Sequence, residues 1–335
     1  MSKTAEAGRQ EVLDLPATLL PWRRLPFPAP WNAIFEGHGP LHLEVGFGDG
    51  RYTVRRALQR PNERFVGLEI STASVMRAVR RIRRERTTNV RLLKVGAQFA
   101  VRHLFAPASL SSITVNFPDP WPKERHEKNR LLRRPFFELA ASRLSPKGAI
   151  LLATDHPEYL EFARREALLS RLFELEEREP PREVFETKYA LKWREQGKEL
   201  HYQAFVNLSR GAPEFPILER PDEMPHALLT GSLPESPQFA KRVLEFAEGH
   251  VILHEVARSL SSEERERLLV RVTVDETDLK QQLLVAVQQR EGSELIVRLE
   301  PFGDPVITDT ARGAVHGVTE WLLEQPGVRL LERNY

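Results

Sequence analysis

The chain has no cysteine and only three methionines among its 335 residues. The absence of cysteine excludes a disulfide scaffold, a Cys-ligated zinc site and a catalytic thiol. No apolar run approaches the roughly 18 residues that a membrane-spanning helix needs, and the N-terminus lacks the apolar core of a signal peptide. We therefore expect a cytoplasmic protein that has no metal site and binds no membrane.

The two halves of the chain carry opposite net charges. Residues 1–210 contain 36 of the 49 Lys and Arg and 25 of the 47 Asp and Glu, which gives +11; the remaining 13 and 22 give −9. A proline-rich stretch marks the boundary. We predict an N-terminal segment packed on the core (1–40), a basic domain (41–212), a linker (213–238) and an acidic domain (239–335). The basic domain is expected to contact a polyanion.

Short apolar runs alternate with helix-length amphipathic stretches from residue 41 onward. The runs are LHLEV, RFVGLEI, VRLLKV, SITVNF and AILLAT. Connections of helix length predict parallel strands, so the fold class is α/β, a Rossmann-like doubly wound sheet. In such sheets, ligands bind outside the carboxyl ends of the strands. The residues that end each strand are therefore the candidates for a site.

The first run ends in a glycine-rich turn that begins with Glu44 and contains Gly46, Gly48 and Gly50. This E-x-G-x-G-x-G pattern resembles motif I of the S-adenosylmethionine-dependent methyltransferases. A dinucleotide fingerprint would need glycine at the position of Arg51, which disfavours a nicotinamide oxidoreductase. The second run ends in Glu69, which is placed to accept ribose hydroxyls. Gly96 follows the third run and has no side chain to offer an adenine.

The stretch from 116 to 130, NFPDPWPKERHEKNR, follows the fourth run. Its three prolines fix the backbone and remove three N–H donors, so the loop is stiff. A stiff loop suits an acceptor that must be held in line with a methyl group. Asp119 supplies a carboxylate, and the basic residues that follow suit phosphate contacts. The Arg-rich helical stretch 76–86 is either a second RNA-backbone surface or a solvated helix face.

Together, LEVGFGDG, FPDPWPKERHEKNR and LLATDH resemble the bacterial tRNA (guanine-N7-)-methyltransferase family, over residues 41–208. The resemblance implies transfer of a methyl group from S-adenosylmethionine to N7 of a guanine in the tRNA variable loop, with Asp119 as the catalytic residue. The implied cofactor-binding residues are Glu44, Gly46, Gly48, Glu69, Gly96 and Asp119. The implied substrate-binding residues are Lys123, Asp155, Thr187 and Tyr189. The implied RNA-contacting residues are Arg125, His126, Lys128 and Arg130.

The sequence departs from the family pattern at two positions. Gly96 stands where the family has Asp or Asn, and Ala190 stands where it has Glu. The alternatives are another base-modifying methyltransferase that acts on RNA or DNA, and a non-catalytic RNA-binding protein of methyltransferase fold. Cofactor-dependent methylation distinguishes these alternatives from one another.

The acidic C-terminal part resembles no family that we identify. The runs HVILHEVA, RLLVRVTVD, QLLVAVQQ and ELIVRLE are closely spaced and strand-like, so we predict antiparallel pairing. TARGAVHGVTEWLLEQ predicts an amphipathic helix. The second domain is therefore expected to be a smaller α+β unit, without a glycine loop or a cluster of metal ligands.

Overall fold

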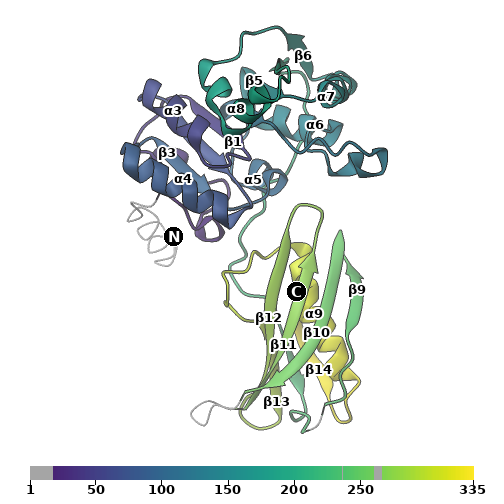
Figure 1. Cartoon of the computed structure of the whole chain (residues 1–335). Helices are drawn as coiled ribbons and strands as arrows, with labels where there is room; N and C mark the ends of the chain where they lie inside the picture. Colours follow the sequence, from purple (N-terminus) through teal and green to yellow (C-terminus); the bar gives the residue numbers. More distant parts are fainter. Residues whose placement is uncertain (1–17, 236, 260–265) are drawn as a thin grey trace. The chain divides into compact units, whose positions relative to one another are not determined.

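The computed structural model describes residues 18–235, 237–259 and 266–335, and the chain divides into two units after Ile217. The first unit contains a seven-stranded sheet in the order β3-β2-β1-β4-β5-β7-β6 (Figure 1). The strands are β1 (Leu41–Val45), β2 (Arg64–Leu68), β3 (Val90–Leu93), β4 (Leu110–Asn116), β5 (Leu144–Thr154), β6 (Phe173–Glu176) and β7 (His201–Asn207). The first five are parallel, and β7 runs antiparallel to β5 and β6. The order reverses between β1 and β4, so the predicted doubly wound α/β class is confirmed.

The helices of the first unit connect these strands. They are η1 (Trp22–Arg24), α2 (Trp31–Ile34), α3 (Arg51–Gln59), α4 (Thr72–Glu85), α5 (Ala97–His103), η2 (Glu124–Asn129), α6 (Arg134–Arg143), α7 (Pro157–Ser170), η3 (Arg182–Glu186) and α8 (Lys188–Glu195). In α4, Val75, Ala78, Val79 and Ile82 recur at helical spacing and are buried, which leaves the arginines on the other faces.

The segment before β1 packs on the sheet unit through two tryptophans. The indole of Trp22 donates to the Lys94 carbonyl at 2.9 Å, and the indole of Trp31 donates to the Leu104 carbonyl at 2.9 Å. The Trp31 ring also stacks on Phe105, with ring centroids 5.2 Å apart. Buried indoles that satisfy their N–H groups in this way hold Trp22 against the end of β3 and Trp31 against the end of α5.

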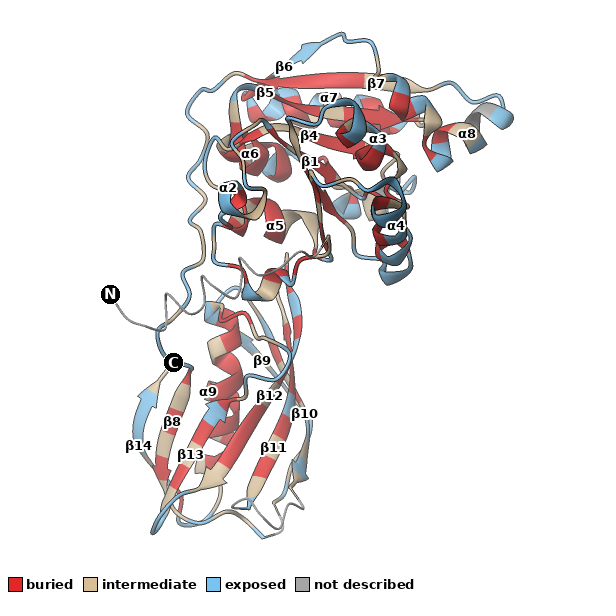
Figure 2. Cartoon of the chain, turned by 90° about the vertical axis from the view of Figure 1, so that its left-hand side faces the viewer, coloured by how far each residue is buried: buried red, intermediate tan, exposed pale blue. Residues whose placement is uncertain are grey.

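The second unit is a seven-stranded antiparallel sheet with one long helix. The sheet order is β14-β8-β13-β12-β11-β10-β9, and α9 packs against it (Figure 1). The elements are β8 (His226–Thr230), β9 (Arg242–Phe246), β10 (Gly249–Arg258), β11 (Arg267–Asp275), β12 (Lys280–Gln289), β13 (Glu294–Leu299), α9 (Asp309–Leu323) and β14 (Arg329–Asn334). Buried and less buried residues alternate along its strands (Figure 2). The predicted α+β unit is confirmed.

One sequence expectation is wrong in the second unit. Residues 213–238 were predicted to be a linker, but 226–230 form β8, which lies between β13 and β14 in the sheet. HALLT is short and sits among prolines, so its local pattern resembles a loop. The segment forms a strand because it pairs with β13 on one side and β14 on the other. Ala227 and Leu229 are then fully buried in the core.

Candidate functional site

The turn after β1 has an unusual backbone at three glycines. Gly46, Gly48 and Gly50 have φ values of 73°, 57° and 73°, in the region that side chains disfavour. A Cβ on Gly46 or Gly48 would meet no atom within 4 Å, so both positions face open space. A Cβ on Gly50 would lie 2.7 Å from the Cβ of Ala78. Gly50 therefore allows α4 to approach the turn closely.

A pocket of about 350 Å³ opens beside this turn. Its walls come from the glycine turn, the start of α3, α4, the end of β4 and the segment that leads into α8. The lining residues include Glu44, Gly46, Gly48, Asp49, Arg51, Ser74, Asn116, Phe117, Thr187 and Tyr189. The fold thus brings five predicted residues of the turn and of the late motif to one cavity: Glu44, Gly46, Gly48, Thr187 and Tyr189. It lies at the carboxyl ends of β1 and β4, where the strand order reverses.

Glu44 is a buried carboxylate at the base of this pocket. The hydroxyl of Thr53 donates to one of its oxygens, and Asn116 Nδ2 donates to Oε1 at 3.1 Å. Burial raises the pKa of Glu44 to about 7, although the hydrogen bonds from Thr53 and Asn116 oppose the shift. The site therefore holds an acid that changes its charge near neutral pH.

Glu69, at the end of β2, receives three backbone hydrogen bonds. Gly48 N donates to Oε2 at 3.1 Å, whereas Ile70 N and Ser71 N donate to Oε1 at 2.8 and 2.9 Å. The carboxylate therefore ties the glycine turn to the start of α4 and keeps lone pairs for a ligand hydroxyl. Gly96 is the N-cap residue of α5 and is absent from the lining of this pocket.

The loop after β4 is held in an uncommon conformation. Phe117 and Trp121 have φ values of 51° and 43°, and they flank the three residues Pro118, Asp119 and Pro120. Asp119 is exposed and lies outside the lining of the 350 Å³ pocket. Positive φ at two large aromatic residues is costly, so the surrounding contacts must hold the loop in place.

Arg130 supplies those contacts, which corrects its predicted RNA-contacting role. Its side chain is buried at 7% exposure and donates to the carbonyls of Pro120 and Trp121 at 2.9 and 3.2 Å. The guanidinium also pairs with Glu127 and lies 4.5 Å from the Phe162 ring centroid. A guanidinium so enclosed supports the loop from beneath and is not available to a phosphate.

The other residues of the basic run are placed differently. Lys123, Arg125 and Lys128 are exposed, and His126 is half-buried with its ring edge-on to Trp121 at 5.8 Å between centroids. These three exposed cations remain suited to phosphate contacts.

The remaining predicted substrate residues are Asp155, which follows β5, and Thr187 and Tyr189, at the start of α8. Asp155 Oδ2 accepts from Lys198 Nζ at 2.7 Å. Thr187 caps α8, because its hydroxyl donates to the Val184 carbonyl at 2.9 Å and accepts from Ala190 N at 3.1 Å. Tyr189 is 47% exposed, with its ring 6.4 Å from that of Phe117. Of this group, Tyr189 is best placed to meet a planar ligand.

Comparison with known proteins identifies the chain. Residues 38–203 match the family model described as "Putative methyltransferase". A tRNA (guanine-N(7)-)-methyltransferase of Thermus thermophilus is 41% identical, with 96% of this chain and 99% of the relative covered. One of Deinococcus radiodurans is 42% identical, covering 88% and 92%. The chain belongs to the tRNA (guanine-N(7)-)-methyltransferase family. A Thermotoga maritima member is 28% identical over 89% of this chain.

These family members match the second unit as well as the first, since each alignment covers at least 88% of this chain. By contrast, the alignment to the Bordetella pertussis member covers 40% of this chain and 53% of that relative. Among solved structures, the 16S rRNA methyltransferase KamB gives a TM-score of 0.41 at 16% identity, covering 52% of this chain and 92% of that chain. That similarity adds nothing to the family assignment.

Sequence reasoning missed several residues of the candidate site. Asn116, Thr53 and Phe117 border the pocket or hold Glu44, and Asp49 and Arg51 line the pocket. Asn116 is the last residue of β4 and lies near the end of the predicted run SITVNF, and that position was a usable signal. Thr53 gives no such signal, because only the turn of α3 places its hydroxyl on Glu44.

No helix among the described residues is long and apolar enough to cross a membrane, and no cluster of metal-ligating side chains occurs in them.

Proposed function

We propose that this chain transfers the methyl group of S-adenosylmethionine to N7 of a guanine in the variable loop of tRNA. The observation that carries the proposal is the identity of 41% and 42% to two tRNA (guanine-N(7)-)-methyltransferases over nearly the full chain. The pocket at the switch point of the sheet supports it, since such crevices hold nucleotide-like cofactors.

The residues present fit the cofactor. Gly46 and Gly48 leave their Cβ positions open toward the pocket, so backbone and ligand can approach closely. Glu69 keeps acceptor capacity on Oε2 for a ribose hydroxyl. Burial raises the pKa of Glu44 to about 7, and a cationic methionine end nearby would favour its carboxylate form. When bound, S-adenosylmethionine supplies a methyl group on a positively charged sulfur. Gly96 leaves the adenine contact to backbone groups.

The acceptor atom determines what the side chains must do. Guanine N7 has a lone pair and no proton, so an obligate general base is not required. Positive charge develops on the purine ring as the bond forms, and a fixed carboxylate stabilises that charge. Asp119 sits on a loop whose conformation Arg130 maintains, which suits this role. Asp155 would accept from the guanine edge once the base displaces or joins Lys198.

The exposed cations Lys123, Arg125 and Lys128 follow Asp119 directly and would contact the tRNA backbone. Each phosphate contact adds to the salt dependence of binding. A tRNA substrate also fits the expected cytoplasmic location.

Nucleoside analysis tests the proposal. The purified chain is incubated with labelled S-adenosylmethionine and unmodified tRNA transcripts, and the product nucleosides are separated. We expect 7-methylguanosine at one variable-loop position. A methyl group on another atom would support a different base-modifying enzyme, and binding without transfer would support a non-catalytic RNA-binding protein.

The role of Asp119 is tested by Asp119→Ala in single-turnover reactions. Loss of one electrostatic stabiliser is expected to lower the rate about 10²- to 10³-fold, while tRNA binding weakens only slightly. Asp309→Ala removes an exposed carboxylate from the second unit and is the matched control. A rate for Asp119→Ala within a few-fold of the wild-type rate would remove this residue from the mechanism.

A further inference from the structure

Helix α3 begins directly at the glycine turn, and three of its arginines reach η3. Arg51 Nη1 donates to the Glu186 carbonyl at 3.3 Å, and the Arg55 guanidinium pairs with the Glu186 carboxylate. Arg56 Nη1 lies 3.6 Å from Glu183 Oε2, and the Glu183 side chain is almost fully buried. The helix that starts at the cofactor turn therefore holds the segment that precedes Thr187.

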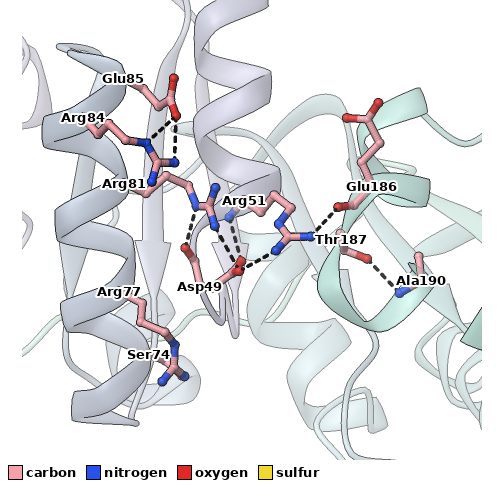
Figure 3. A network of polar contacts seen from close by, with 10 residues as sticks. All are labelled: Asp49, Arg51, Ser74, Arg77, Arg81, Arg84, Glu85, Glu186, Thr187 and Ala190. Atoms are coloured by element: carbon pink, nitrogen blue, oxygen red, sulfur yellow. Dashed lines mark hydrogen bonds and ion pairs between the residues drawn. The ribbon is translucent and has the colours of Figure 1, made fainter. Parts of the chain in front are cut away.

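Asp49, the residue between Gly48 and Gly50, joins Arg51 to a second guanidinium. Its Oδ2 accepts from Arg51 Nη2 at 3.2 Å and from Arg81 Nη2 at 3.1 Å (Figure 3). Its Oδ1 accepts from Arg51 N at 3.2 Å, and its carbonyl accepts from Arg81 Nε at 3.1 Å. One carboxylate thus pairs with two guanidiniums from different helices.

The position of the late substrate segment depends on these contacts. Arg51 holds the carbonyl of Glu186, and Thr187 follows it and caps α8 by accepting from Ala190 N (Figure 3). Tyr189 lies in the first turn of α8 and lines the same pocket as Asp49. A shift of the Arg51 guanidinium would therefore be transmitted to Thr187 and Tyr189.

We propose that Asp49 is a positioning residue: it orients Arg51, and through Arg51 it fixes the segment 187–190 beside the cofactor turn. The role of that segment in placing the guanine rests on the proposed function. Asp49, Arg51 and Arg81 have side-chain exposures of 16%, 25% and 23%, so water screens their charges only partly. Removing the carboxylate charge leaves the two guanidiniums to repel each other.

The first measurement is amide hydrogen exchange without any substrate, which tests the coupling even if tRNA is not the substrate. Ala190 N and Leu191 N bond to Thr187 and report on the start of α8. Loss of one charge-assisted hydrogen bond is expected to speed exchange of residues 187–192 about tenfold in Asp49→Asn and in Arg51→Met. Glu85→Gln, which breaks the more exposed Arg84–Glu85 pair on α4, is the matched control and should leave this exchange unchanged.

The second measurement separates positioning from cofactor binding. At saturating S-adenosylmethionine, Asp49→Asn and Arg51→Met should each lower kcat for tRNA methylation about tenfold, with cofactor Kd changed less than about twofold. Because both residues act through one contact, the double variant should be no slower than the slower single variant. Arg51→Lys retains a donor for the Glu186 carbonyl and should recover part of the rate.

Three results would overturn the proposal. Cofactor Kd could rise in proportion to the loss of rate, which would make Asp49 or Arg51 a direct cofactor contact. The two single effects could multiply in the double variant, which would make them independent. Amide exchange of residues 187–192 in Asp49→Asn and Arg51→Met could be as slow as in the control Glu85→Gln, which would mean that the carboxylate does not position this segment. If exchange is faster in Asp49→Asn and Arg51→Met as expected but the wild-type protein methylates no tRNA, only the proposed function is contradicted.

Discussion

One buried polar side chain from each unit illustrates two different roles. Glu44 in the first unit is an ionisable acid beneath a pocket, and its pKa is raised to about 7 by burial. Gln281 in the second unit is a neutral amide that exchanges two hydrogen bonds of 2.9 Å with the backbone of Val306. Gln281 fixes the chain just before α9, whereas Glu44 places a variable charge beside a cavity. A buried charge next to a cavity therefore indicates a site, and a fully paired buried amide indicates a structural contact.

The largest effect is expected at the core of the second unit. Trp321 is fully buried, donates to the Gln238 carbonyl at 3.0 Å and contacts the Phe239 ring edge-on. Trp321→Ala should lower the unfolding free energy of this unit by about 3–5 kcal/mol, measured by chemical denaturation. Cofactor binding should be unaffected, because the pocket lies wholly in the first unit. A parallel loss of cofactor affinity would mean that the two units depend on each other energetically.

Glu44→Gln should change how stability depends on pH. The pKa of Glu44 is about 7 in the folded state against an ordinary value of 4.5, so the folded state retains a proton that the unfolded state releases. The unfolding free energy of the wild-type first unit should therefore decrease by on the order of 3 kcal/mol as the pH rises from 4.5 to 7. Denaturation at pH 5 and pH 8 should show that Glu44→Gln lacks this decrease. Parallel pH profiles for the two proteins would show that Glu44 titrates normally.

Gln281→Leu tests the opposite kind of buried polar group. The substitution leaves the N–H and the carbonyl of Val306 without their partner, which should cost about 1–3 kcal/mol. This loss should be independent of pH, because an amide does not titrate. A pH-dependent loss would contradict the contrast between Gln281 and Glu44. The measurement is denaturation of the second unit at the same two pH values.

The smallest effect is expected at the start of α9. Thr308 caps this helix by accepting from Ala311 N at 3.0 Å, so Thr308→Ala should lower the unfolding free energy by about 1 kcal/mol. Ser71 caps α4 with a longer bond of 3.4 Å, and Ser71→Ala should cost less. Thermal unfolding of both variants compares the caps. A larger loss at Ser71 would reverse the expected order.

The sequence predicted the doubly wound class and the first five strands of the first unit because their signals are local, but it missed β6 and the antiparallel β7. Strand and helix periodicities alternate there, and glycines mark the turn at the strand end. The same reasoning missed β9, which pairs with the adjacent β10, and β8, whose short run becomes a strand only when it pairs with the distant β13 and β14. The family resemblance also implied an RNA contact for Arg130, although hydrogen bonds to Pro120, Trp121 and Glu127 and the Phe162 ring enclose its guanidinium.

By itself, the sequence determined the doubly wound class, the glycine turn and the acids at the strand ends, because these depend on spacing along the chain. Only the tertiary structure decided which of these residues share a cavity. It placed Thr53 and Asn116 on Glu44, enclosed Arg130 beneath the FPDPW loop and joined Arg51 to Glu186 across 135 positions. The sequence gives the type and charge of each residue, but the burial of a side chain and its hydrogen-bond partners depend on how distant segments pack.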